Sequence, residues 1–306
     1  MNLYKFSLDD FLVLISKGLK NQITVDDILV EEVKLSHLKR IDKVFNKGLH
    51  YYLDPKAPET SKEASIFFRK QNFNSDLNIG AKKVVNHFEE FKISLSAIAK
   101  LSDMEFKRSF QIYKISDDPK KVAKDIREVL YPDFTNNLKE FLKALISKFA
   151  EHNILVFEFV EYWNQKEKAN IDGFFLNPNV IVLKRQQMSF RREIFTLIHE
   201  LGHFLLNEEE IEKLEIEHLA NDNLSSIERW CNDFSFHFLA GDLANTIKKI
   251  QSAGPENDYH FELIERISKR THLSQIALFT RLLLDRKISP SNYNNVKSEF
   301  EEAFKE

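Results

Sequence analysis

The middle of the chain switches between the hydrophobic periods of helices and of strands. Apolar residues recur every three or four positions in two segments, residues 119–130 and 135–151, which predicts two amphipathic helices. Three apolar runs with the length of strands follow, at residues 154–159, 173–176 and 180–183. The turn residues Asn177-Pro178-Asn179 separate the last two runs, so we expect these strands to form a hairpin. Two helices, a small sheet and a further helix predict an α+β domain.

That further helix spans residues 189–207, SFRREIFTLIHELGHFLLN. Ser189 is a suitable N-cap, and Glu193 puts negative charge near the first turn. The apolar residues cover such a broad surface that we expect the helix to be buried. Gly202 in its interior costs about 1 kcal/mol of helix propensity relative to Ala. We therefore expect another backbone to pass close to this face.

Within this helix, His199, Glu200 and His203 form an H-E-x-x-H motif. Residues four apart lie on the same face of a helix, so both imidazoles can reach one ion. Two neutral imidazoles suit zinc and leave room for a third ligand and a water molecule. Glu200 lies beside the ion, where it can take a proton from the water and return it to a leaving amine. The alternative is a buried helix with two structural histidines, because such a motif arises by chance in about one chain in a hundred of this length.

Glu228 is the best candidate for the third ligand. It lies 25 residues after His203, near the start of IERWCNDFSFHFLAG, and a carboxylate from this second helix completes a catalytic zinc set. On the Glu228 stripe, Asn232 and Ser235 are candidates to orient the carboxylate, whereas His237 faces elsewhere. The rival ligands lie in an acidic segment typical of a solvated face: His218, Glu208, Glu209, Glu210, Glu212, Glu215, Glu217 and Asp222.

The two segments together resemble the ImmA/IrrE family of metallo-endopeptidases. That family has an R-x-x-F-T-x-x-H-E-x-x-H helix followed by a helix with E-x-x-A/C-N-x-F-A. The matching residues are Arg192, Phe195, Thr196, His199, Glu200, His203, Glu228, Cys231, Asn232 and Phe234. Ser235 replaces the usual Ala, and Leu239-Ala240-Gly241 replaces the usual Leu-x-Pro ending. The resemblance is specific over residues 172–241.

The resemblance implies a mostly helical α+β zinc peptidase with a small mixed sheet. This sheet would pack on the helix that carries the H-E-x-x-H motif, the metal helix. His199, His203 and Glu228 would hold the zinc ion, with manganese as the alternative, and Glu200 would be the catalytic base. Relatives typically cleave a helix-turn-helix repressor and so relieve repression, which implies a repressor as the protein substrate. The donor that stabilises the oxyanion stays open, with Tyr259, His260 and Arg281 as candidates.

The sequence predicts four consecutive parts. Residues 1–60 are predicted to form a helical domain that resembles a degenerate helix-turn-helix. Two of its helices begin at the capping residues Ser7 and Thr24, and a third spans residues 36–45. Residues 61–115 form a helical connector, in which a long helix is expected over residues 79–109. Residues 116–245 form the peptidase domain, and residues 246–306 form a helical C-terminal part with a charged, frayed end over residues 297–306.

DNA binding is the alternative activity of the two helical ends. The N-terminal helices resemble part of a repressor domain, but no recognition helix rich in Arg, Asn and Gln is visible. The C-terminal pair around Ser274 resembles a helix-turn-helix superficially, although its apolar residues are better explained as a packed core. A DNA- or partner-binding transcriptional regulator with a non-catalytic metal site is therefore the second hypothesis for the whole chain.

The composition and charge of the chain limit its partners and its location more than they limit its reaction. A net charge of −3 gives no general attraction to nucleic acid. Cys231 is the only cysteine, which excludes an intramolecular disulfide and leaves a packed thiol or, less favoured, a thiol close to the metal. The apolar run Phe11 to Ile15 is too short for a signal peptide, and no stretch is long enough to span a membrane. We expect a cytoplasmic protein without a membrane partner.

The edge of the predicted sheet has a functional interpretation as well as a structural one. An extended peptide can add to an edge strand through main-chain hydrogen bonds and so present its scissile bond to the metal. The order of strand, metal helix and ligand helix favours this interpretation over an ordinary edge strand.

Overall fold

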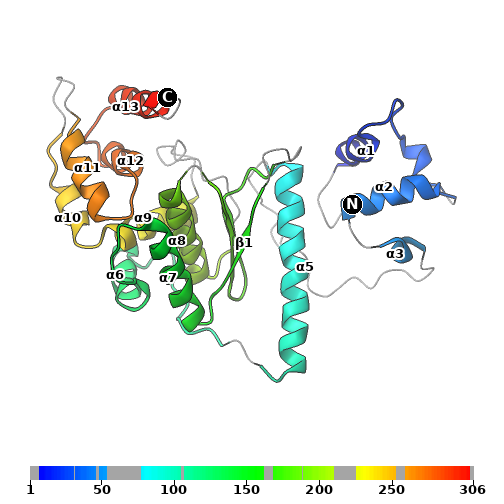
Figure 1. The fold of residues 1–306 in the computed structure, drawn as a ribbon, viewed down its shortest axis with the longest axis horizontal. Helices are drawn as coiled ribbons and strands as arrows, with labels where there is room; N and C mark the ends of the chain where they lie inside the picture. The colour runs from blue at the N-terminus through cyan, green and yellow to red at the C-terminus, as the bar shows by residue number, and fades with distance from the viewer. Residues whose placement is uncertain are drawn as a thin grey trace.

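The computed structural model describes residues 7–30, 32–45, 48–53, 77–104, 107–161, 168–187, 189–209, 225–252 and 259–303. Within these residues the fold is α+β, mostly helical, with one small mixed sheet, as the sequence predicts (Figure 1). No described helix is both long enough and apolar enough to cross a membrane.

The sheet consists of β1 (Leu155–Phe159), β2 (Gly173–Leu176) and β3 (Val180–Lys184), in the order β1-β3-β2. β1 runs parallel to β3, whereas β2 runs antiparallel to it, with Gly173 opposite Leu183. The hairpin predicted around residues 177–179 is therefore confirmed. Both β1 and β2 are edge strands of this sheet.

Helices cover both faces of the sheet: α5 (Ile79–Leu101) on one side, and α7 (Leu138–Glu151) and α8 (Phe190–Leu206) on the other (Figure 1). Alternate residues of a strand point to opposite faces. Phe175 and Ile181 accordingly pack in the cluster that contains α7 and α8. Phe174 and Val182 pack with α5 instead. Because both faces of the sheet are buried, the sequences of β2 and β3 are continuous apolar runs.

The metal helix α8 is packed against α9 (Ser226–Ala240), which in turn packs on α6 (Pro119–Leu130). α9 ends at Gly241, whose φ of +54° belongs to the left-handed region that favours glycine. The guanidinium of Arg127 lies against this glycine and donates to the carbonyl of Phe238. The turn after the second helix is therefore built without the proline of the related pattern.

The C-terminal helices share one core with α6 to α9. They are α10 (Leu243–Lys248), α11 (Phe261–Arg270), α12 (Gln275–Leu284) and α13 (Pro290–Ala303). Arg191 of α8 donates to the carbonyls of Ser268, Thr271 and Leu273 and so holds the α11–α12 corner against the metal helix. The prediction of a frayed end after residue 297 is wrong as far as Ala303, because Phe300 packs on Phe261 and Phe279.

The N-terminal helices have a small core of their own. They are α1 (Leu8–Ser16), the 3-10 helix η2 (Val25–Asp27), α2 (Leu35–Phe45) and α3 (Leu49–Leu53). The core consists of Phe11, Ile15, Ile23 and Phe45. Arg40 of α2 donates to the carbonyl of Ile15 at the end of α1, and Thr24 with Asp27 forms the predicted capping box. The connecting residues 54–76, which include the predicted linker, lie outside the described residues.

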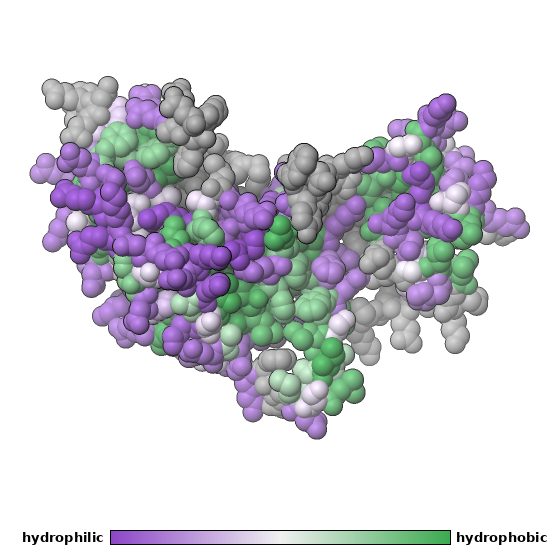
Figure 2. Space-filling view, in the orientation of Figure 1, coloured by the Kyte–Doolittle hydropathy of each residue, from purple (hydrophilic) through white to green (hydrophobic). Residues whose placement is uncertain are grey.

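The helix predicted over residues 79–109 ends earlier, at Leu101. Asp103 adopts a left-handed conformation, with φ of 51°, which stops the helix. The last turns of α5 extend past the sheet and expose apolar side chains there, with Ile98 60% and Leu101 87% exposed (Figures 1 and 2). This end of the helix is not covered by residues that the structure describes.

Candidate metal centre

The metal helix begins at the N-cap that the sequence predicts. The hydroxyl of Ser189 accepts from the backbone N–H of Arg192, and Asn207 ends the helix in a left-handed conformation. All residues from Thr196 to Leu206 are buried. The H-E-x-x-H face therefore lies inside the protein, against β2 and α9.

The two histidines and Glu228 meet at a single point. The Nε2 atoms of His199 and His203 lie 3.1 Å apart. Each Nε2 atom is 3.0 Å from a different carboxylate oxygen of Glu228. All three side chains are buried, and their ligand atoms lie within 4.8 Å of one another.

This donor set suits one divalent ion. Ligand atoms about 2.0–2.1 Å from a tetrahedral zinc ion are roughly 3.4 Å from one another, close to the separations found here. Both Nε2 atoms face the carboxylate, while the Nδ1 atoms are buried and have no hydrogen-bond partner among the described residues. His199, His203 and Glu228 could therefore hold a metal ion, and the donor types alone do not select zinc over manganese.

Close approach of two backbones brings Glu228 to the histidines. A Cβ atom added to Gly202 would lie 3.0 Å from Sγ and 3.2 Å from Cα of Cys231, so a larger residue would push α9 away from α8. The expectation that another backbone passes Gly202 is thus confirmed. Ser225 caps α9 by accepting from the N–H of Glu228, which puts this carboxylate in the first turn, at the level of the histidines.

Glu200 lies on the same helix but is not one of the three converging residues. It is 3% exposed, and its Oε2 atom has no hydrogen-bond partner within the described part of the chain. Burial raises the pKa of Glu200 to about 7, and the charges of Glu228 and Asp172 act in the same direction, whereas His203 and His199 oppose them. A carboxyl group with this pKa can both accept and release a proton near neutral pH.

The cluster is strongly coupled through its charges. Burial by itself would raise the pKa of Glu228, but His199 and His203 lower it below its usual range. Burial by itself would lower the pKa of His203, but Cys231 and the Glu228 carboxylate raise it well above its ordinary value. We therefore expect a proton on His203 in the metal-free protein below this raised pKa.

We expect metal binding to release this proton, because a ligating imidazole must be neutral. Since the pKa of His203 is raised, the apparent metal affinity should increase about tenfold per pH unit from pH 6.5 until the raised pKa is passed. Titration calorimetry in two buffers of different ionisation enthalpy should show about one proton released per ion at pH 7. Equal heats in the two buffers, after correction for dilution, would contradict this assignment.

The side chains expected to support Glu228 are engaged differently. The Ser235 hydroxyl donates to the carbonyl of Cys231 rather than to Glu228. The Oδ1 atom of Asn232 is buried and has no partner among the described residues. Cys231 is buried, its thiol interacts with His203, and burial raises its pKa to about 11. The thiol is thus packed and close to the metal ligands at once.

The candidates for oxyanion stabilisation are engaged in the C-terminal part. Arg281 forms ion pairs with Asp233 and Asp285, and Nε2 of His260 lies 3.0 Å from the carbonyl oxygen of Gln251. Tyr259 is buried in the main core.

The structure describes only some of the residues that rival Glu228 as the third ligand. Glu209 accepts from the backbone N–H of Asn177 in the β2–β3 turn, so it is engaged away from the cluster. The other rivals from Glu210 to Asp222 fall on residues 210–224, which lie outside the described part of the chain.

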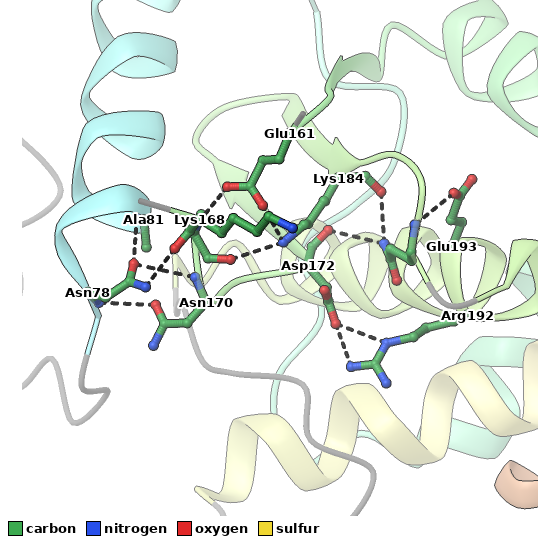
Figure 3. Close-up of polar contacts among 11 residues, drawn as sticks. Asn78, Ala81, Glu161, Lys168, Asn170, Asp172, Lys184, Arg192 and Glu193 are labelled. Carbon is green, nitrogen blue, oxygen red and sulfur yellow. Dashed lines mark hydrogen bonds and ion pairs between the residues drawn. The ribbon is translucent and has the colours of Figure 1, made fainter. Parts of the chain in front are cut away.

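A polar network beside the metal helix was not predicted from the sequence. The Asp172 carboxylate accepts from Nε and Nη2 of Arg192, at 3.0 and 2.6 Å, and so joins the start of β2 to α8 (Figure 3). Next to it, a Cβ atom on Gly173 would lie 2.8 Å from Thr196 Cγ2 and 3.2 Å from Glu200 Cγ. The glycine lets β2 approach the face of α8 that carries Thr196 and Glu200. The only sequence signal for this contact was a glycine inside a strand pattern.

Comparison with known proteins agrees with this geometry. Residues 149–242 match the sequence profile of the Peptidase_M78 family, described as the IrrE N-terminal-like domain. The matched segment contains the whole sheet, α8 and α9, and it confirms the resemblance to the ImmA/IrrE family in this part of the chain. No curated protein and no solved structure matches the chain.

Proposed function

We propose that this chain, whose residues 149–242 match the Peptidase_M78 family, is a zinc-dependent endopeptidase that cleaves a protein partner. The family match supports a metallopeptidase role. One observation carries the proposal: His199, His203 and Glu228 converge from two helices while Glu200 stays outside the ligand set. That arrangement leaves a metal ion with an open position and a base beside it.

The chemistry divides between the ion and Glu200. A zinc ion held by His199, His203 and Glu228 would supply Lewis-acid chemistry, namely polarisation of the scissile carbonyl and a lower pKa for a water molecule. Glu200, with its pKa raised by burial, takes the proton of the attacking water. It then passes this proton to the nitrogen of the departing amine, so one residue serves as base and as acid. Burial of the cluster strengthens each of these electrostatic interactions.

The outer edge of β2 is the proposed seat of the substrate main chain. The N–H of Lys184 donates to the carbonyl of Asp172 at 2.8 Å, so these residues form a hydrogen-bonded pair. Bonded and non-bonded pairs alternate in antiparallel ladders, so the N–H and C=O of Gly173 point away from β3. No described strand occupies that side of β2. A peptide paired with Gly173 would present its main chain beside Glu200.

The proposed substrate is a helix-turn-helix repressor in the cytoplasm, whose cleavage would relieve repression. The resemblance to the ImmA/IrrE family is the support for this choice. The N-terminal helices are a suitable docking unit for such a partner, because Leu29, Leu35 and Leu53 are exposed there. Acidic and basic residues balance over residues 7–53, with seven of each, which favours a protein partner over DNA.

Incubation with the repressor encoded beside this chain tests the proposal. We expect discrete repressor fragments when the protein is loaded with zinc, none after treatment with a chelator, and recovery when zinc is added back. Gel electrophoresis and mass spectrometry would detect the fragments and locate the scissile bond. An intact repressor in every arm would count against this substrate, and intact casein with the zinc-loaded protein would count against peptidase activity.

The second candidate is a regulator that binds DNA or a partner, with a metal site that is not catalytic. The separate core of the N-terminal helices and their exposed apolar side chains are the observations in its favour. A gel shift on its own promoter that weakens with salt and is unchanged by Glu200→Gln would select this function. Absence of any shift leaves the endopeptidase as the better account.

A further inference from the structure

The Glu200 side chain lies close to the start of β2. Its Oε2 atom has no hydrogen-bond partner among the described residues. Its Cγ methylene, by contrast, is only 3.2 Å from the position that a Cβ atom on Gly173 would take. A displacement of the start of β2 would therefore open space around this side chain and change the direction of its carboxylate.

The peptide bond between Asp172 and Gly173 is held through its carbonyl oxygen. This oxygen accepts from the backbone N–H of Lys184 at 2.8 Å and from Nε2 of Gln187 at 3.3 Å. The first bond belongs to the β2–β3 ladder. The second comes from the side chain of a residue that follows the sheet and precedes α8.

Gln187 joins three elements at this point. Its Nε2 also donates to the carbonyl of Lys184 at 2.9 Å, and its Oε1 accepts from the hydroxyl of Thr196 at 3.3 Å. Its backbone N–H donates to Glu193 Oε1 at 3.3 Å, and Glu193 is itself paired with Arg185. One amide group thus connects β2, β3 and the face of α8 that carries Glu200.

The surrounding network holds the same strand from other directions. Arg192 binds the Asp172 carboxylate, and Lys184 binds Glu161 at 2.7 Å and the carbonyl of Ala169 at 3.0 Å (Figure 3). These ion pairs anchor the segment before β2. The side chain of Gln187 links the peptide preceding Gly173 to Thr196, one turn before Glu200.

We propose that Gln187 is a positioning residue: its amide keeps Gly173 seated on α8 and thereby holds Glu200 in line with the attacking water. This inference rests on the proposed peptidase function, but it concerns only how the base is held. Gln187 touches neither the potential metal ligands nor, in this proposal, the substrate. Its loss should therefore change turnover and the mobility of β2 while metal binding persists.

Two variants separate its hydrogen bonds from its bulk. Gln187→Ala removes the side chain, whereas Gln187→Glu keeps its size but replaces the donor with an oxygen that faces two carbonyls. Asn179→Ala is the matched control, because it removes a partly buried side-chain hydrogen bond, to the carbonyl of Asn153, at the opposite end of β3. All variants are made in the full chain and loaded with zinc.

We expect both Gln187 variants to lower kcat for fluorescein-labelled casein by about 10-fold or more, with KM and zinc content within about twofold of wild type. Hydrogen exchange of the peptide covering residues 171–176 should accelerate about 10-fold in both variants and stay near the wild-type rate in Asn179→Ala. A Gln187→Glu protein with wild-type kcat and exchange would overturn the inference, because bulk alone would then suffice.

The exchange measurement keeps the inference separate from the proposed function. If zinc-loaded wild type leaves casein intact, the peptidase proposal loses support, whereas faster exchange in both Gln187 variants still supports the link through Gln187. If casein is cleaved and the Gln187 variants match wild type in exchange and in kcat, the peptidase stands and the positioning role is refuted.

Discussion

Glu200→Gln should reduce cleavage of the repressor by about 100- to 10,000-fold while the protein keeps its full complement of zinc. The amide has nearly the shape of the carboxylate but cannot take a proton from the attacking water. Glu200 is not among the converging ligands, so metal content, measured by mass spectrometry, should equal that of wild type.

The pH dependence identifies the same group. A carboxylate acts as a base only when it is ionised, and burial raises the pKa of Glu200 to about 7. Cleavage by wild type should therefore increase with pH through this pKa, and a bound cation moves that rise to or below pH 7. The residual activity of Glu200→Gln should lack this rise.

Glu89→Gln is the matched control for this experiment, because Glu89 is a buried glutamate on α5, outside the metal cluster. It should cleave the repressor at about the wild-type rate. Full activity in the Glu200→Gln protein would remove Glu200 from the mechanism and leave the metal site without an identified base.

Glu228→Ala should abolish activity by a different route, through loss of the metal. The carboxylate contributes one oxygen to each imidazole, at 3.0 Å in both cases, and it is the only acidic group in the cluster found in the described residues. Changes outside the ligand set already cost about 10- to 100-fold in metal affinity, so we expect loss of this ligand to cost at least about 100-fold. Metal content after dialysis, together with competition against a chelating dye, measures the effect.

Asp233→Ala provides the comparison on the same helix. Asp233 is 46% exposed on its side chain and pairs with Arg281, so its removal should leave zinc bound. Circular dichroism should show unchanged helix content in both variants, because Glu228 is held in the first turn of α9 through its backbone. Wild-type zinc affinity in Glu228→Ala would exclude Glu228 as a ligand and reopen the choice among the acidic residues before α9.

The local parts of the site were predictable because they depend on short-range rules. The spacing of His199 and His203 places both on one face once the segment is helical, and Ser189 marks where that helix begins. Gly202 indicated a close neighbour before any neighbour was known, and the neighbour is Cys231 of α9. The hairpin followed in the same way from two apolar runs separated by turn residues.

The supporting contacts were not predictable, since they join residues with no fixed spacing. Nothing in the pattern around Gln187 indicates that its amide reaches both Asp172 and Thr196. Ser235 lies on the stripe of Glu228, yet its hydroxyl turns back to the carbonyl four residues earlier. The last helix was underestimated because its charged composition concealed the packing of Phe300 on two distant aromatic rings.

The sequence by itself determined the helix that carries His199, Glu200 and His203, the hairpin before it, and the carboxylate that could complete the set. These depend on periodicity, capping and residue type, which act within a few positions of the chain. The tertiary structure decided which side chains support that set. Glu228 reaches the histidines because Gly202 leaves room for α9 to approach α8 closely. Glu200 lies beside β2 because Gly173 leaves room for the start of that strand. Contacts between distant segments depend on how whole elements pack, and no local pattern specifies them.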